Sequence, residues 1–183
     1  VGGSGFSSMV ERSTNYNQFE LIFNSILGYE SRNDRAILIS VAQQLWDSTD
    51  PEIYLPHIVE GYGEILEPNT ILTIHSANDA QVPMLSSDRA TRTAGIPVIS
   101  SSTRLPYDVE IVDGPITGSA LVYFDGDFPG VPESNIAPHQ SQHSLAHNLI
   151  AGVTEVNEMV FGFLFTGIVE NTCGQICTFE ADW

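Results

Sequence analysis

The sequence contains no lysine and only six arginines, against 23 aspartates and glutamates, so that its formal net charge is −17 over 183 residues. A surface this acidic repels the phosphate backbone of nucleic acids and the headgroups of anionic membranes. We therefore expect no nucleic-acid partner. A net charge of this size is typical of the surface of a soluble secreted or salt-adapted protein, and a dedicated cation-binding role is the alternative.

Long apolar runs are also missing. No stretch reaches the roughly 18 apolar residues that a membrane-spanning helix requires, and we expect no transmembrane segment. The first residues, Val1-Gly2-Gly3-Ser4-Gly5-Phe6, include neither an initiator methionine nor a basic stretch. This beginning indicates a processed chain, either freed of its signal or cut from a longer precursor.

Cysteine occurs only twice, at Cys173 and Cys177, in a short segment that includes a glycine. A local disulfide is the favoured interpretation, and it implies an oxidising compartment and thus a secreted, extracellular or periplasmic protein. Half of a zinc site is the alternative. The segment has no second cysteine pair, however, and the nearest histidine is distant in sequence.

The chain also lacks the G-x-S-x-G turn that presents a nucleophilic serine in many α/β enzymes. The nearest approach is Gly2-Gly3-Ser4-Gly5, where Phe6 replaces the final glycine and no strand precedes Ser4. We therefore do not assign Ser4 as a nucleophile.

Hydrophobic residues make up 42% of the chain and include nine Phe, six Tyr and two Trp. This is enough material for a sizeable core, and the length fits a single domain over residues 1–183. The sequence therefore indicates a globular protein.

Three helices are expected in the first third, because apolar residues recur there at helical spacing. The first runs from Asn17 to Leu27 and ends at Gly28. The second begins near Asp34, which we expect to cap it, and ends before Asp47. A short third helix starts at Pro51, after a cap at the preceding aspartate.

Strands and helices alternate in the rest of the chain. We expect strands at Thr70 to His75, Ile96 to Ile99 and Gly118 to Phe124, and helices at Leu85 to Thr93 and Leu149 to Thr166. This alternation predicts an α/β fold with three layers, in which helices cover both faces of a mostly parallel sheet.

The most informative segment is Ile71 to Pro83, where a β-rich run delivers Asp79 into a turn. A parallel sheet places ligand-binding groups at the carboxyl ends of its strands, so Asp79 is a candidate for the acid that orients a catalytic histidine. The alternative is that Asn78-Asp79 forms only an Asx turn. His75 lies on the strand itself and is interpreted as a hydrogen-bonded core residue.

Three histidines, His139, His143 and His147, follow one another at intervals of four residues. On one helix they would share a face and could bind a transition metal, although Pro138 and the polar residues after it argue against a helix in the first half. A catalytic triad needs only one histidine. We assign the general base to His147, which lies closest to the final helix, and keep His143 as the second choice.

The order of an aspartate, a histidine and a cysteine pair resembles the C-terminal half of secreted bacterial α/β-hydrolases of the esterase and lipase type. The similarity covers most of the chain. It rests on these stretches: Ala42 to Asp47, Asp50-Pro51 with Tyr54, Asn78 to Pro83, Gly95-Ile96-Pro97, Gly118 to Leu121, Ala146-His147, and Cys173 to Cys177.

The resemblance implies that Asp79 is the acid and His147 the general base of a Ser-His-Asp triad, which hydrolyses carboxylic esters of small molecules or lipids without a cofactor. The serine and the oxyanion hole would lie on a preceding segment, so the expected partner is an N-terminal chain of the same precursor. Alone, the chain should be neither active nor stably folded. The alternative is a non-catalytic extracellular structural, assembly or adhesion protein, with a metal held by His139, His143 and His147 as one version.

Overall fold

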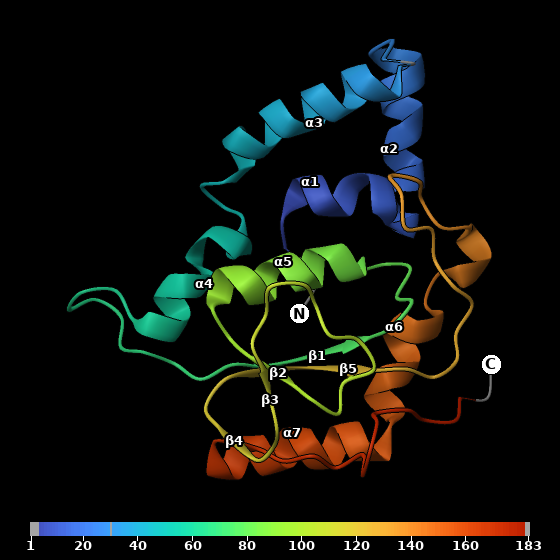
Figure 1. Cartoon of the computed structure of the whole chain (residues 1–183). Coiled ribbons are helices and arrows are strands. Elements are labelled where there is room, and N and C mark those ends of the chain that lie inside the picture. Colours follow the sequence, from blue (N-terminus) through green and yellow to red (C-terminus); the bar gives the residue numbers. More distant parts are fainter. Residues whose placement is uncertain (1–3, 30, 182–183) are drawn as a thin grey trace.

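A computed structural model describes residues 4–29 and 31–181 of the chain. Its centre is a four-stranded sheet in the order β1-β5-β2-β3, in which every neighbouring pair is parallel (Figure 1). The strands are β1 (Leu72–Ser76), β5 (Ala120–Phe124), β2 (Val98–Ile99) and β3 (Ile111–Val112). The expected α/β fold with a parallel sheet is confirmed at this level.

The central strand β5 is buried along its whole length and packs on both sides. The covering helices are α5 (Met84–Ala94) and α7 (Thr154–Thr166). Val122 lies in an apolar cluster with Met159 of α7, whereas its neighbour Leu121 lies in a second cluster against Met84 of α5. This alternation follows from the two-residue period of a strand, and helices accordingly lie on both faces of the sheet (Figure 1).

Strand β5 lies between β1 and β2 and is paired with both. The helix α5 therefore connects two strands that are parallel but not adjacent. Strand β1 occupies the edge of the sheet, since none of the described residues pairs with its outer side. A second, antiparallel ribbon joins β4 (Ile116–Thr117) to β6 (Ile168–Val169).

The helices expected in the first third are present. They are α2 (Asn17–Leu21), which continues as the π-helical turn η3 (Ile22–Ile26), α3 (Arg32–Trp46) and α4 (Pro51–Glu60). Three shorter segments precede them: α1 (Phe6–Met9), η1 (Val10–Arg12) and η2 (Thr14–Tyr16).

The caps of these helices differ in part from expectation. The cap of α3 is Ser31, whose hydroxyl accepts from the backbone N–H of Asp34 at 3.4 Å, so the expectation that Asp34 itself is the cap is wrong. Asp50 caps α4 as expected, accepting from the N–H of Glu52 at 3.1 Å. It also accepts from the N–H groups of Gly5 at 2.9 Å and Phe6 at 2.8 Å, and so ties the start of α1 to the start of α4.

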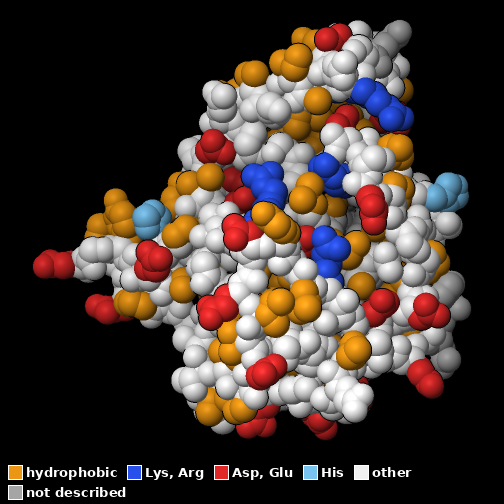
Figure 2. All heavy atoms as spheres, viewed as in Figure 1, with side chains coloured by type: hydrophobic (Ala, Val, Ile, Leu, Met, Phe, Trp, Pro, Cys, Tyr) orange, Lys and Arg blue, Asp and Glu red, His pale blue; other side chains and the backbone are white. Residues whose placement is uncertain are grey.

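The apolar pattern of α3 does not face a core. Ile37 is 64% exposed, Val41 53% and Leu45 80%, and Figure 2 shows hydrophobic side chains exposed along this helix. In α3 only Ile39 and Arg35 are buried. An exposed apolar stripe of this kind commonly marks an interaction site.

The chain beyond β5 forms a series of short elements before the last long helix. They are η4 (Gln140–Gln142), α6 (Leu145–Leu149) and η5 (Ile150–Gly152). The expected final helix therefore begins at Thr154 rather than at Leu149. Within the described ranges, no single helix is long and apolar enough to cross a membrane, and only the bent pair Gln140–Gly152 and Thr154–Thr166 passes that test together.

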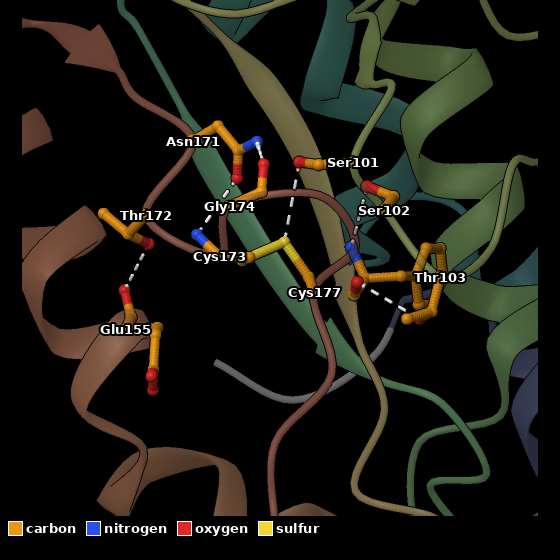
Figure 3. Close-up of a disulfide and its surroundings, with 10 residues drawn as sticks. Ser101, Ser102, Thr103, Glu155, Asn171, Thr172, Cys173, Gly174 and Cys177 are labelled. Atoms are coloured by element: carbon orange, nitrogen blue, oxygen red, sulfur yellow. Dashed lines mark hydrogen bonds between the residues drawn. A yellow bond between two sulfur atoms is a disulfide. The ribbon is translucent and has the colours of Figure 1, made fainter.

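Cys173 and Cys177 are joined in the local disulfide that the sequence favours. Figure 3 shows it between the segment that follows β2 and the start of α7. The Cys177 N–H donates to the Ser101 carbonyl at 2.8 Å, and the Thr172 hydroxyl donates to the Glu155 carbonyl at 2.7 Å. The cross-linked loop thereby fastens the end of the chain to the carboxyl edge of the sheet.

Candidate active site

Asp79 lies in the turn that follows β1 and is only 7% exposed. The turn is formed by Asn78 in the left-handed conformation, with φ of 59°, which asparagine tolerates better than most residues. One carboxylate oxygen of Asp79, Oδ1, accepts from the backbone N–H groups of Gln81 at 2.7 Å and Val82 at 2.9 Å. This is the Asx turn considered as the simpler interpretation of the sequence.

The second oxygen of Asp79 is used differently. Oδ2 lies 2.8 Å from Nδ1 of His147, so the two side chains form a hydrogen-bonded pair across 68 positions of sequence. The two interpretations of Asp79 are therefore not exclusive. One oxygen holds the turn, and the other holds an imidazole.

His147 is placed by the short helix α6. Ser144 precedes this helix in the left-handed conformation, with φ of 68°, and its hydroxyl accepts from the Gln81 side-chain amide at 3.2 Å. The His147 side chain remains 37% exposed. Because the Asp79 carboxylate is an acceptor, it favours a proton on Nδ1 and leaves the lone pair on Nε2. Within the described ranges, Nε2 has no hydrogen-bond partner.

The other two histidines of the series have separate partners. His143 Nδ1 lies 2.8 Å from the Thr14 hydroxyl, and His139 Nδ1 lies 2.8 Å from the Ser141 hydroxyl. The expected alternative of a three-histidine metal site is wrong, because the segment is broken at Ser144 and does not form one helix. Across residues 4–29 and 31–181, no group of three or more metal-binding side chains is assembled.

The chain matches no protein-family model, no curated protein and no solved structure. What the site can do therefore follows from its own geometry.

His75 lies behind the site, on β1, and its Nδ1 is 3.0 Å from the Ser87 hydroxyl. Its ring also packs against Tyr123, with the ring centres 5.6 Å apart. These contacts agree with its interpretation as a hydrogen-bonded core residue. Burial lowers the pKa of His75 to about 4, although the carboxylates of Asp79 and Asp88 oppose this shift.

The lowered pKa of His75 predicts that the folded state weakens in mild acid. The unfolded chain takes up the proton near pH 6.5 and the folded protein only near pH 4, so the stability from neutral His75 is complete above about pH 6.5 and is lost as the pH falls toward 4. Urea unfolding at pH 7 and at pH 4 should show a loss of about 3 kcal/mol from this group. His75→Gln should reduce that loss, and the exposed His57→Gln should not. Equal losses in all three proteins would contradict this role of His75.

A segment that the sequence did not single out lies against the acid turn. The Ser13 hydroxyl donates to the Gln81 carbonyl at 2.7 Å, and the Thr14 N–H donates to the Ala80 carbonyl at 2.8 Å. Ser13 and Thr14 lie more than 60 positions before the turn, and neither belongs to a recognisable motif. No local pattern could have identified them.

The arrangement at Asp79 and His147 has the chemistry of an acid and base pair. A carboxylate bonded to Nδ1 orients the imidazole and stabilises its protonated form, while the opposite nitrogen is available to accept a proton. The described part of the chain shows no hydroxyl or thiol bonded to that nitrogen. A nucleophile or a water molecule beside Nε2 would complete the site.

Proposed function

We propose that the chain supplies the acid and base of a serine hydrolase that cleaves carboxylic esters. Asp79 is the acid and His147 the general base. The observation that supports this most directly is the 2.8 Å bond between Asp79 Oδ2 and His147 Nδ1. The nucleophilic serine, in this proposal, belongs to a polypeptide segment outside the 183 residues.

The chemistry assigns each group one task. His147 Nε2 takes the proton of the serine hydroxyl as the serine oxygen bonds to the ester carbonyl carbon, and then gives that proton to the departing alcohol. A water molecule next loses its proton to Nε2 as it attacks the acyl-enzyme, and the serine recovers a proton when the acid leaves. Asp79 stabilises the imidazolium in both halves.

The position of β1 supports a particular place for the missing segment. Because β1 is at the sheet edge with its outer side unpaired in the described residues, a further parallel strand would continue the sheet there. Parallel strands end at the same sheet edge and lie about 4.8 Å apart. A serine in the turn after that added strand would come close to His147 Nε2, within the roughly 3 Å that proton transfer requires.

The charge of the chain favours neutral substrates. A net charge of −17 repels anionic esters and leaves uncharged esters of small molecules or lipids as the preferred class. The disulfide between Cys173 and Cys177 fits an oxidising, extracellular or periplasmic setting. Both properties agree with the resemblance to secreted esterases and lipases.

Non-catalytic assembly is the second candidate, and one observation favours it. Besides the stripe on α3, the end of α7 exposes Phe161, Leu164 and Phe165, of which Phe165 is 86% exposed. Such apolar surface indicates that the chain binds another protein surface. A hydrolase completed by a partner would also use it, so the test must detect an activated serine.

The experiment is to treat the natively assembled protein with a fluorophosphonate probe. An activated serine oxygen bonds to phosphorus, fluoride leaves, and the serine proton passes through the base to solvent. Intact-mass analysis and peptide mapping should locate the label on a serine outside residues 1–183. A neutral ester substrate should slow the labelling, and unfolding the protein first should prevent it.

The possible outcomes separate the candidates. No labelling of the folded assembly would reject the hydrolase and leave the assembly role. A label on a serine of this chain, such as Ser4, would keep the hydrolase but reject the external nucleophile. Labelling of the partner segment would support the proposal in full.

A further inference from the structure

We infer that Thr14 is a positioning residue that fastens the acid turn to the histidine segment, and this inference rests on the function proposed above. Thr14 is 1% exposed. Its N–H donates to the Ala80 carbonyl at 2.8 Å, one residue after the acid. Its hydroxyl lies 2.8 Å from His143 Nδ1, and its carbonyl accepts from the Gln140 side chain at 2.7 Å. All three of its polar groups therefore connect the two halves of the site.

Two neighbouring hydrogen bonds also help to connect the acid turn to the histidine segment. The Ser13 hydroxyl donates to the Gln81 carbonyl at 2.7 Å, and the Gln81 side chain donates to Ser144 at 3.2 Å. We call Ser13 and Thr14 the clasp. It contacts the acid turn on one side and reaches the segment 140–144 on the other. His147 follows that segment by only three residues.

The histidine segment needs such an anchor because of its own structure. Helix α6 has only five residues, Leu145–Leu149, and it follows the three-residue turn η4 and the left-handed Ser144. Helices this short gain little stability from their own hydrogen bonds. The position of His147 relative to Asp79 therefore depends on contacts that the surrounding chain provides.

The clasp also explains the different roles of two histidines. The Nδ1 of His143 is bonded to Thr14, whereas the Nδ1 of His147 is bonded to Asp79. His143 thus serves as the attachment point of the histidine segment and His147 as its functional residue. Loss of the Thr14 hydroxyl should loosen the segment and displace His147, and small displacements of this kind reduce rates strongly.

The experiment compares Thr14→Val with Thr14→Ser, which retains the hydroxyl, in the natively assembled protein. Thr91→Val is the matched control, because Thr91 is also buried, at 2% exposed, and its hydroxyl donates to the Ser87 carbonyl at 2.9 Å within α5. The first readout is the NMR spectrum of the His147 ring, together with the exchange rate of the Nδ1 proton shared with Asp79. The second is kcat for a neutral ester, with its pH profile.

In Thr14→Val we expect the NMR resonances of the His147 ring to move, the shared proton to exchange faster, and kcat to fall by roughly tenfold to a hundredfold while KM changes less. Thr14→Ser should restore all three, and Thr91→Val should leave them unchanged. His143→Ala removes the other side of the same bond at an exposed position, and should reproduce the His147 shift even if Thr14→Val does not fold.

Unchanged His147 ring resonances and an unchanged exchange rate of the shared proton, in both folded Thr14→Val and His143→Ala, would overturn the clasp. The NMR readout does not depend on ester hydrolysis. If the assembly cleaves no ester but the His147 signals respond as expected, the clasp stands and the proposed function fails.

Discussion

Replacing His147 with alanine should lower kcat for ester hydrolysis by about 10⁴-fold or more, the usual consequence of removing the base of a triad. The serine would then have no acceptor for its proton, and the leaving alcohol no donor. The fold should be little affected, since the His147 side chain is 37% exposed and, among the described residues, it is hydrogen-bonded only to Asp79. The measurement is the steady-state rate, together with the rate of fluorophosphonate labelling.

The matched control for this variant is His57→Ala. His57 is an exposed imidazole on α4, whose ring packs against Tyr62 with the ring centres 4.6 Å apart, and it does not contact the site. Its removal should leave both rates unchanged. Retention of normal hydrolysis in His147→Ala would show that another residue is the base.

Asp79→Asn should lower kcat by a similar factor, about 10⁴-fold, with little loss of stability. The asparagine carbonyl can still accept from the N–H groups of Gln81 and Val82, and so keep the turn. Its amide then faces His147 Nδ1 and donates to it, which places the imidazole proton on Nε2. The base is held in the wrong tautomer, so activity is lost while folding is retained.

Asp125→Asn provides the control for that change. Asp125 follows β5, at the same edge of the sheet, and its Oδ1 accepts from the N–H of Asp127 at 2.9 Å in a similar turn. Among the described residues it has no histidine partner, so kcat should not change. Urea unfolding of both variants checks that the folds are equally stable. Undiminished hydrolysis in Asp79→Asn would remove the acid from the proposed mechanism.

The parts of this fold that sequence predicts are those with a strong local pattern. Helices α3 and α5 have helical periodicity, and β1 and β5 are β-rich runs bounded by polar turns. Cap chemistry was predictable at Asp50, where a proline follows. At α3 the expected cap, Asp34, was wrong, and the helix is capped by Ser31 three residues earlier.

Long-range features were not predictable. The strands β3, β4 and β6 have two residues each, too few for a recognisable pattern. The placement of β5 between β1 and β2 depends on packing between segments far apart in the chain. The apolar residues of α3 gave a correct helix, but their pattern does not say whether its apolar stripe is covered by this chain.

At the candidate site, chain order indicated Asp79 and a histidine of the segment before the last helix, since an acid after one strand and a histidine in that segment are brought to the same sheet edge. Chain order alone did not distinguish His143 from His147. The contacts that distinguish them are the bond from His147 to Asp79, across 68 positions, and the bond from His143 to Thr14, across 129 positions, and a single sequence contains no signal of either.

One oxygen of Asp79 holds the turn and the other binds His147, and this affects which of the two residues would be retained if the activity were lost. A mutation of Asp79 that removed its carbonyl oxygen would take away the bonds to Gln81 and Val82 and disturb the turn, whereas loss of His147 would spare it. In a lineage that had abandoned hydrolysis, selection for folding would thus preserve an acidic or amide residue at position 79 long after the imidazole had gone. Active and inactive proteins of this kind should therefore differ at position 147 rather than at position 79.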